Sequence, residues 1–158
     1  FILEAAAYTH DIGIRPAEEK YGRCDGKLQE QEGPIVAQKM LSELGFENYI
    51  IDRICYLIGH HHTYDNVEGL DYQVLIEADF LVNLYEDDIN RNGIESAYKN
   101  IFRTDTGKRI FEDGYMIIDK QTYKVLFDNG EYILKNIFNC DTIQLKNNSN
   151  IGVFADEI

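Results

Sequence analysis

The stretch AAAYTHDIGI, residues 5–14, is an apolar, alanine-rich run that stops at an adjacent histidine and aspartate. The apolar character extends over residues 1–12, which predicts a helix that is apolar almost all round and therefore lies centrally in the fold. Gly13 and Pro16 are expected to end this helix. His10 and Asp11 then stand at the end of a buried helix, where a charged group is costly unless it is paired or bound to a metal. The rest of the sequence has to supply their partners.

The segment that follows is polar and rich in glycine. Residues 13–34 read as a long loop, and loops of that length are often functional. Pro34 fits the first position of the next helix, and Gly45 suits a left-handed cap at its end. Later helices are expected after the capping residues Asn48 and Asp71 and over residues 93–102.

The chain changes character towards its C-terminus. Residues 122–134 contain two strand-like runs around Asn129-Gly130, a hairpin turn signal, and residues 141–155 are a candidate second hairpin. Strands of this kind could pair with a second copy of the chain, so a homo-oligomer is compatible with the sequence. We expect a mainly α fold in two parts, a helical domain over residues 1–118 and a strand-rich tail over residues 119–158.

Composition narrows the class of partner. The chain has 15 Lys and Arg against 28 Asp and Glu, a net charge of -13, which repels nucleic acids and anionic membranes. A small phosphorylated substrate stays compatible, because local cations or a metal outweigh the global field. Three cysteines without C-x-x-C spacing favour a reducing compartment such as the cytoplasm. The chain begins at Phe1 with no capping residue before it, so we expect further sequence upstream.

Asp79 is the first candidate partner for the His-Asp pair. It lies within the apolar stripe of the helix expected after Asp71, and a carboxylate that faces a core is costly unless it is paired or metal-bound. The alternative is that Asp79 caps a neighbouring helix or bonds a buried tyrosine. The stripe consists of Leu75, Ala78, Val82 and Tyr85.

The second candidate is the histidine run in LIGHHHTYD, residues 57–65. Helical spacing continues the inward stripes to His61 and His62, whereas His60 falls on another face. The alternative is a solvated helix C-terminus, where positive charge suits the helix dipole. Imidazole and carboxylate groups on three helices, without a thiolate set, suit one or two divalent ions of Mn, Fe, Ni, Co, Mg or Zn.

This ordered set of motifs resembles the HD-domain metal-dependent phosphohydrolase superfamily over about residues 1–118. The carrying motifs are HD closing one helix, HH closing a later one, and the aspartate of EADFLVNL. The resemblance implies an all-α bundle that hydrolyses a phosphate ester, often a nucleotide, at a metal site. It also implies a further histidine upstream of the pair, which would lie before residue 1.

The resemblance also implies roles for single residues. His10, Asp11 and Asp79 match the ligands of the first metal. His61 and His62 match the paired histidines that hold a second metal in two-metal members, where Asp11 would bridge the ions. Glu32, or with less support Glu30, stands near the position of a further ligand.

The polar segment after the pair offers groups for the substrate. A bound metal would lower the pKa of a water molecule and so supply the nucleophile. The reaction would also need a general acid and cations that bind the phosphate. Glu18 and Glu19 are candidate general acids. The candidate phosphate-binding cations are Arg15, Lys20, Arg23 and Lys27. The alternative for all six is an ordinary solvated loop.

Two other functions stay open. The first is a catalytically impaired HD-like module that binds a nucleotide or a regulatory partner without turnover, favoured by the missing upstream histidine. The second is a helical interaction domain in which His10, Asp11 and Asp79 are structural. Bound metal and phosphate release separate the three hypotheses.

Overall fold

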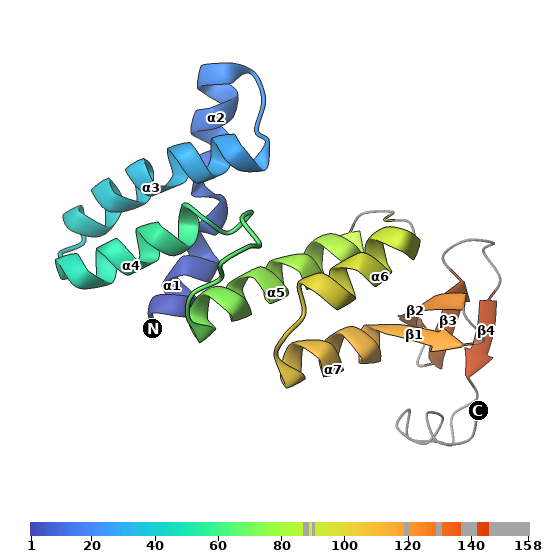
Figure 1. Cartoon of the computed structure of the whole chain (residues 1–158). Helices are drawn as coiled ribbons and strands as arrows, with labels where there is room; N and C mark the ends of the chain where they lie inside the picture. The colour runs from blue at the N-terminus through green and yellow to red at the C-terminus, as the bar shows by residue number, and fades with distance from the viewer. Residues whose placement is uncertain (87–88, 90, 119–120, 129–130, 137–141, 146–158) are drawn as a thin grey trace. The chain divides into compact units, whose positions relative to one another are not determined.

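The structure is a computed structural model that describes residues 1–86, 89, 91–118, 121–128, 131–136 and 142–145. The chain forms two compact units, Phe1–Asn83 and Leu84–Ile158, so the division falls inside a helix and not at residue 118. The described part is mainly helical, as the sequence predicts (Figure 1). Its helices include none that is both long enough and apolar enough to cross a membrane.

The first unit is built from helices joined by short turns (Figure 1). Its elements are α1 (Ile2–Thr9), the 3₁₀ turn η1 (His10–Gly13), α2 (Ile14–Tyr21), α3 (Gly26–Glu43), α4 (Asn48–Ile58) and α5 (Leu70–Glu86), which runs past the boundary of the unit. Helix α4 packs against both α3 and α1. Its buried residues recur at helical spacing, as predicted, and they are Ile51, Ile54, Leu57 and Ile58.

The long loop predicted over residues 13–34 is wrong, because α2 and the first half of α3 occupy it. Asp25 caps α3, its carboxylate accepting a hydrogen bond from the Leu28 amide at 3.3 Å. Pro34 consequently lies inside α3 and not at its start. The polar residues of α2 face water, while Ala17 is fully buried. A helix with one small buried side chain therefore forms where the composition resembles that of a loop.

Two further expectations about helices are corrected. Helix α1 is not central, since Phe1 and Tyr8 are 66% and 92% exposed, although Ala6 is buried. The predicted cap Asn48 is instead the first residue of α4, and Asp71 lies one residue inside α5. The left-handed residue predicted at the end of α3 is confirmed by the φ of +79° at Gly45.

The backbones of η1 and α3 touch at a pair of glycines. A Cβ on Gly13 would lie 2.5 Å from the Gln29 carbonyl oxygen and 2.8 Å from the Gly33 amide nitrogen. A Cβ on Gly33 would lie 2.6 Å from Cγ2 of Ile58 on α4. The absence of side chains at both positions therefore lets η1, which carries His10 and Asp11, lie directly on α3.

The second unit combines two short helices with strands (Figure 1). Its elements are α6 (Arg91–Asn100), α7 (Asp105–Gly114), β1 (Tyr115–Ile118), β2 (Gln121–Asp128), β3 (Glu131–Asn136) and β4 (Thr142–Leu145). The strands pair antiparallel in the order β1-β2-β3-β4, with Asp128 opposite Glu131. Helix α6 agrees with the expectation, whereas α7 was not predicted. The Asn129-Gly130 turn and residues 146–155 lie outside the described residues.

Candidate metal centre

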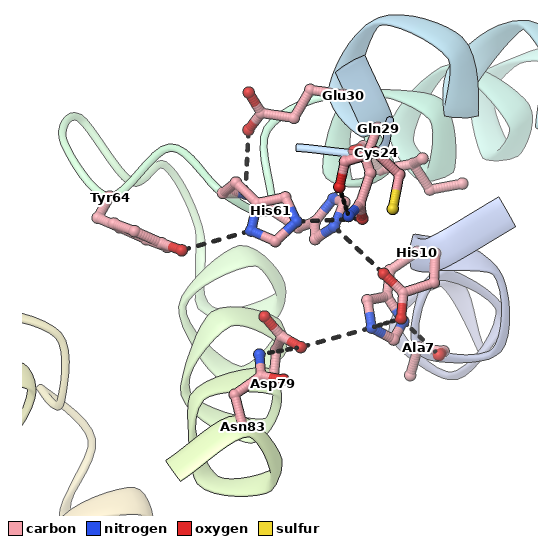
Figure 2. A network of polar contacts seen from close by, with 12 residues as sticks. Ala7, His10, Cys24, Gln29, Glu30, His61, Tyr64, Asp79 and Asn83 are labelled. Carbon is pink, nitrogen blue, oxygen red and sulfur yellow. Dashed lines mark hydrogen bonds and ion pairs between the residues drawn. The ribbon is translucent and has the colours of Figure 1, made fainter. Parts of the chain in front are cut away.

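Four side chains from three separate segments of the chain meet in the first unit. His10 and Asp11 come from η1, His61 from the turn after α4, and Asp79 from α5; Figure 2 shows His10 and Asp79 facing each other. The His10 Nε2 atom lies 3.2 Å from Asp11 Oδ2 and 3.6 Å from Asp79 Oδ1. The His61 Nε2 atom lies 3.8 Å from Asp11 Oδ1. The cluster therefore joins two imidazoles to two carboxylates.

Two sets of contacts hold the histidine turn, which follows α4, close to the helix α5 that carries Asp79. The Tyr72 hydroxyl shares its single proton between the His60 carbonyl, at 2.6 Å, and the Thr63 carbonyl, which ties both ends of the histidine turn to α5. Arg53 of α4 makes a two-pronged ion pair with Asp71, at 2.9 and 2.6 Å. These bonds fix the position of the turn relative to the helix that carries the buried aspartate.

Backbone carbonyls orient the two imidazoles. The Nδ1 atom of His10 lies 2.9 Å from the Ala7 carbonyl, and that of His61 lies 2.7 Å from the Ile58 carbonyl. Since a carbonyl oxygen only accepts, each Nδ1 carries a proton, and each Nε2 is directed at the carboxylates. Metal-bound histidines commonly use their second nitrogen in this way.

Two buried acceptors in the cluster have no hydrogen-bond donor among the described residues. They are Nε2 of His61, whose side chain is fully buried, and Oδ2 of Asp79. The other oxygen of Asp79 accepts from Asn83 Nδ2 at 3.0 Å. An unsatisfied buried acceptor costs about 1–3 kcal/mol. A cation bound by either atom would remove that cost. The residues whose ligand atoms lie close enough to share one ion, within 4.8 Å of one another, are Asp11, His61 and His62 among the described residues.

The charges of the cluster shift the pKa values of its members. The hydrogen bond to Asp11, supported by Asp79, raises the pKa of His10 to about 10. The hydrogen bond from His10 holds the pKa of Asp11 well below its ordinary value. Without a metal, His10 is therefore protonated at neutral pH, and its proton balances carboxylate charge that a bound cation would balance instead.

The raised pKa of His10 predicts a pH-dependent stability for the metal-free chain. Because the folded state holds this proton more tightly than the unfolded state, the stabilisation is complete below about pH 6.5 and is lost as the pH rises towards 10. Urea unfolding with a chelator present should show the gap in unfolding free energy between wild type and His10→Gln shrinking over that range. Asp11 is half exposed, so screening by water keeps the effect modest. A gap that widens with pH would contradict the assignment.

The structure does not bring Glu32 or Glu30 into the cluster as ligands. The Glu32 carboxylate accepts from Lys20 Nζ and from the Tyr21 hydroxyl, both at 2.9 Å, because its position on α3 faces α2. The Glu30 carboxylate accepts from the backbone of His62 at 3.0 Å and so caps the histidine turn. Both acids therefore stabilise the fold around the site.

Gln29 is the α3 residue that does reach the histidines, and the sequence analysis missed it. Its Oε1 atom lies 3.2 Å from Nε2 of His62. The sequence signal that could have identified Gln29 is Asp25, a helix-capping residue four positions before it. A helix that starts there places Gln29 and Gly33 on one face, next to η1.

Most of the predicted substrate-binding cations are paired with nearby acids. Arg15 binds Glu19 at 2.8 Å, Lys20 binds Glu32, and Arg23 lies 3.5 Å from Asp25. Among the described residues, none of the predicted acids or cations forms an ion pair or hydrogen bond with the four-residue cluster. The two predicted acids are Glu18, which accepts from the Cys24 thiol at 3.7 Å, and Glu19. Lys27 is exposed and has no ion pair in the described part.

The apolar stripe predicted for the helix that carries Asp79 is partly wrong. Val82 is 53% exposed and Ala78 is exposed as well, so the face of α5 that enters the core is formed by Tyr72, Leu75 and Ile76. The side chain of Asp79 lies at the edge of this face and is only 11% exposed. A second acid of α5 that the analysis missed, Glu77, is 2% exposed and accepts from Gln73 at 2.7 Å.

Comparisons with protein-family models, with curated proteins and with solved structures found no match to this chain. The observations that bear on the role of the cluster are the direction of each imidazole, the two unpartnered acceptors and the order of the motifs along the chain.

Proposed function

We propose that this chain is a metal-dependent phosphohydrolase with an HD-like bundle, whose site holds a divalent cation on His10, Asp11, His61 and Asp79. The observation that carries the proposal is the pair of buried acceptors, His61 Nε2 and Asp79 Oδ2, that no donor of the described chain satisfies. The reaction class comes from the resemblance, since the His-Asp, His-His and Asp motifs occur in that order along a helical unit, on η1, after α4 and on α5.

The residues of the cluster divide into anchors and an exposed member. His61 is fully buried and Asp79 nearly so, and each is fixed by a neighbouring group, the Ile58 carbonyl or Asn83. Asp11 is half exposed, so water and substrate reach the site on its side. A bound divalent cation supplies Lewis-acid activation of water and of the phosphoryl group.

Lys27 is the predicted cation that remains available for the substrate phosphate. It follows Gly26, whose backbone packs so closely on the His62 ring that a Cβ there would lie 2.7 Å from it. An exposed ammonium would attract a phosphorylated substrate despite the net charge of -13. A nucleotide is the substrate class that the resemblance favours.

The test is cation content combined with phosphate release. We expect the metal-free chain to take up a divalent ion and then to hydrolyse nucleoside phosphates or a generic phosphodiester when Mn, Fe, Ni, Co, Mg or Zn is added singly. A bound cation without turnover of any substrate would favour the nucleotide-binding or regulatory module. A chain that binds no cation would leave the cluster with a structural role and would refute the proposal.

A further inference from the structure

The two adjacent histidines of the turn are bonded in opposite ways. His61 donates from Nδ1 to the Ile58 carbonyl and leaves its buried Nε2 without a partner. His62 has contacts at both ring nitrogens, with Nε2 3.2 Å from Gln29 Oε1 and Nδ1 3.5 Å from the Tyr64 hydroxyl. The nitrogen that His61 keeps open is therefore occupied in His62.

The orientation of the Gln29 amide decides where the His62 proton lies. The Gln29 Nε2 group donates to the Cys24 carbonyl at 3.3 Å, which turns its Oε1 towards His62. An amide oxygen only accepts, so Nε2 of His62 carries the proton in this contact. A protonated ring nitrogen has no lone pair to give a metal. Gln29 is 8% exposed, and its bonds are thus largely shielded from water.

The His62 ring is also held on its other sides. The ring lies against Gly26, and its centroid is 4.1 Å from that of His61. The backbone amide of His62 donates to Glu30 at 3.0 Å. Tyr64, whose hydroxyl faces Nδ1, is itself packed edge-on against Phe80, with ring centroids 4.9 Å apart. Rotation of His62 to present another nitrogen would break several of these contacts.

We propose that Gln29 limits this site to a single divalent cation, by keeping His62 as a hydrogen-bond donor outside the ligand set. Proximity by itself would admit His62, because Asp11, His61 and His62 each offer a ligand atom within 4.8 Å of the others. The hydrogen bond from His62 to Gln29 is what separates the two histidines. This inference rests on the proposed function, since it presupposes that the cluster binds a cation.

The charges around the site also favour a single bound cation. Two divalent ions a few ångströms apart repel each other strongly and need anionic ligands between and around them. Glu30 is engaged by the histidine turn, and Glu32 by Lys20 and Tyr21. At the α3 position that reaches the histidines, Gln29 offers a neutral amide where a second cation would need a carboxylate or a free imidazole.

The experiment is a titration of the full chain with Mn²⁺ alone, read by metal content after equilibrium dialysis and by electron paramagnetic resonance. Wild type should bind one Mn²⁺ per chain and give the spectrum of an isolated ion. Gln29→Glu, which matches glutamine in shape and adds a charge, should bind a second ion and give the spectrum of a spin-coupled pair. His62→Gln should keep the single ion, whereas His61→Gln should weaken its binding by on the order of 100-fold.

The outcomes separate this inference from the proposed function. A spin-coupled pair in wild type, or loss of the ion in His62→Gln, would overturn the inference and leave the metal-dependent function standing. A single ion in Gln29→Glu would show that Gln29 does not set the count. A wild-type chain that binds no Mn²⁺ at all would refute both. The wild-type stoichiometry needs no variant, so a substitution that fails to fold does not remove the test.

Discussion

Replacing Asp79 with alanine should weaken cation binding by on the order of 100-fold or more and abolish any phosphate release. The substitution removes a buried carboxylate with an oxygen that has no other partner in the described chain. A change in a group that merely orients a ligand costs about 10–100-fold, and loss of the ligand itself should cost at least as much. Asp11→Ala should act in the same direction, because that carboxylate lies between His10 and His61.

Thermal unfolding with and without the cation measures this effect directly. At a cation concentration of about 100 times Kd, binding should stabilise wild type by about 2.7 kcal/mol, and Asp79→Ala should lose that increment. The metal-free variant should still fold, since Asp79 gives up a single bond to Asn83 and its pairing with His10. Asp52→Ala, which removes an exposed carboxylate of α4, is the matched control and should keep the full increment. An Asp79→Ala chain that stays fully active would sink the ligand assignment.

Gly13→Ala should be the most destabilising single-methyl change in the first unit. The added Cβ would lie 2.5 and 2.8 Å from backbone atoms of Gln29 and Gly33, and neither can move without displacing α3. Overpacking typically costs about 1–3 kcal/mol, and a clash with backbone on two sides belongs at or above the upper end. A loss of about 3 kcal/mol lowers the Tm of a domain this size by on the order of 10 °C or more.

Gly22→Ala is the control for the Gly13 prediction. Gly22 has a φ of +69°, which an alanine adopts at a cost of about 1–2 kcal/mol, but no atom lies within 4 Å of the Cβ it would gain. The comparison therefore separates a steric clash from backbone strain. If both substitutions lower Tm equally, the contact between η1 and α3 is looser than the structure has it. Cation affinity should also fall in Gly13→Ala, since η1 carries Asp11.

Local patterns were enough for the helices with clear apolar spacing and for the identity of the clustered groups. The helical spacing of Ile51, Cys55 and Ile58 predicted α4, and the adjacency of His10 and Asp11 placed both on one turn. Local patterns failed between residues 13 and 34. Composition there resembles a loop, yet the Asp25 cap and the burial of Ala17 make helices of it.

The wrong start predicted for α3 also led to a wrong choice of site residue on that helix. A helix that begins at Pro34 makes Glu32 a plausible ligand at its entrance, whereas a helix that begins after Asp25 turns Glu32 towards Lys20 and puts Gln29 beside His62. Which of two residues three positions apart reaches the site depends on helix phase. Phase is set by where the helix starts.

Residue identity and spacing alone supply the chemistry of this protein: an adjacent His-Asp pair, a histidine run and an aspartate near the buried face of a helix. The spacing of these groups is a local property of the chain. Which of these groups meet, and which nitrogen each imidazole presents, depends on the packing of the helices. Those outcomes depend on the backbone contact at Gly13 and Gly33 and on carbonyls that fix the histidine rings, and such long-range contacts leave no periodic signal in the sequence.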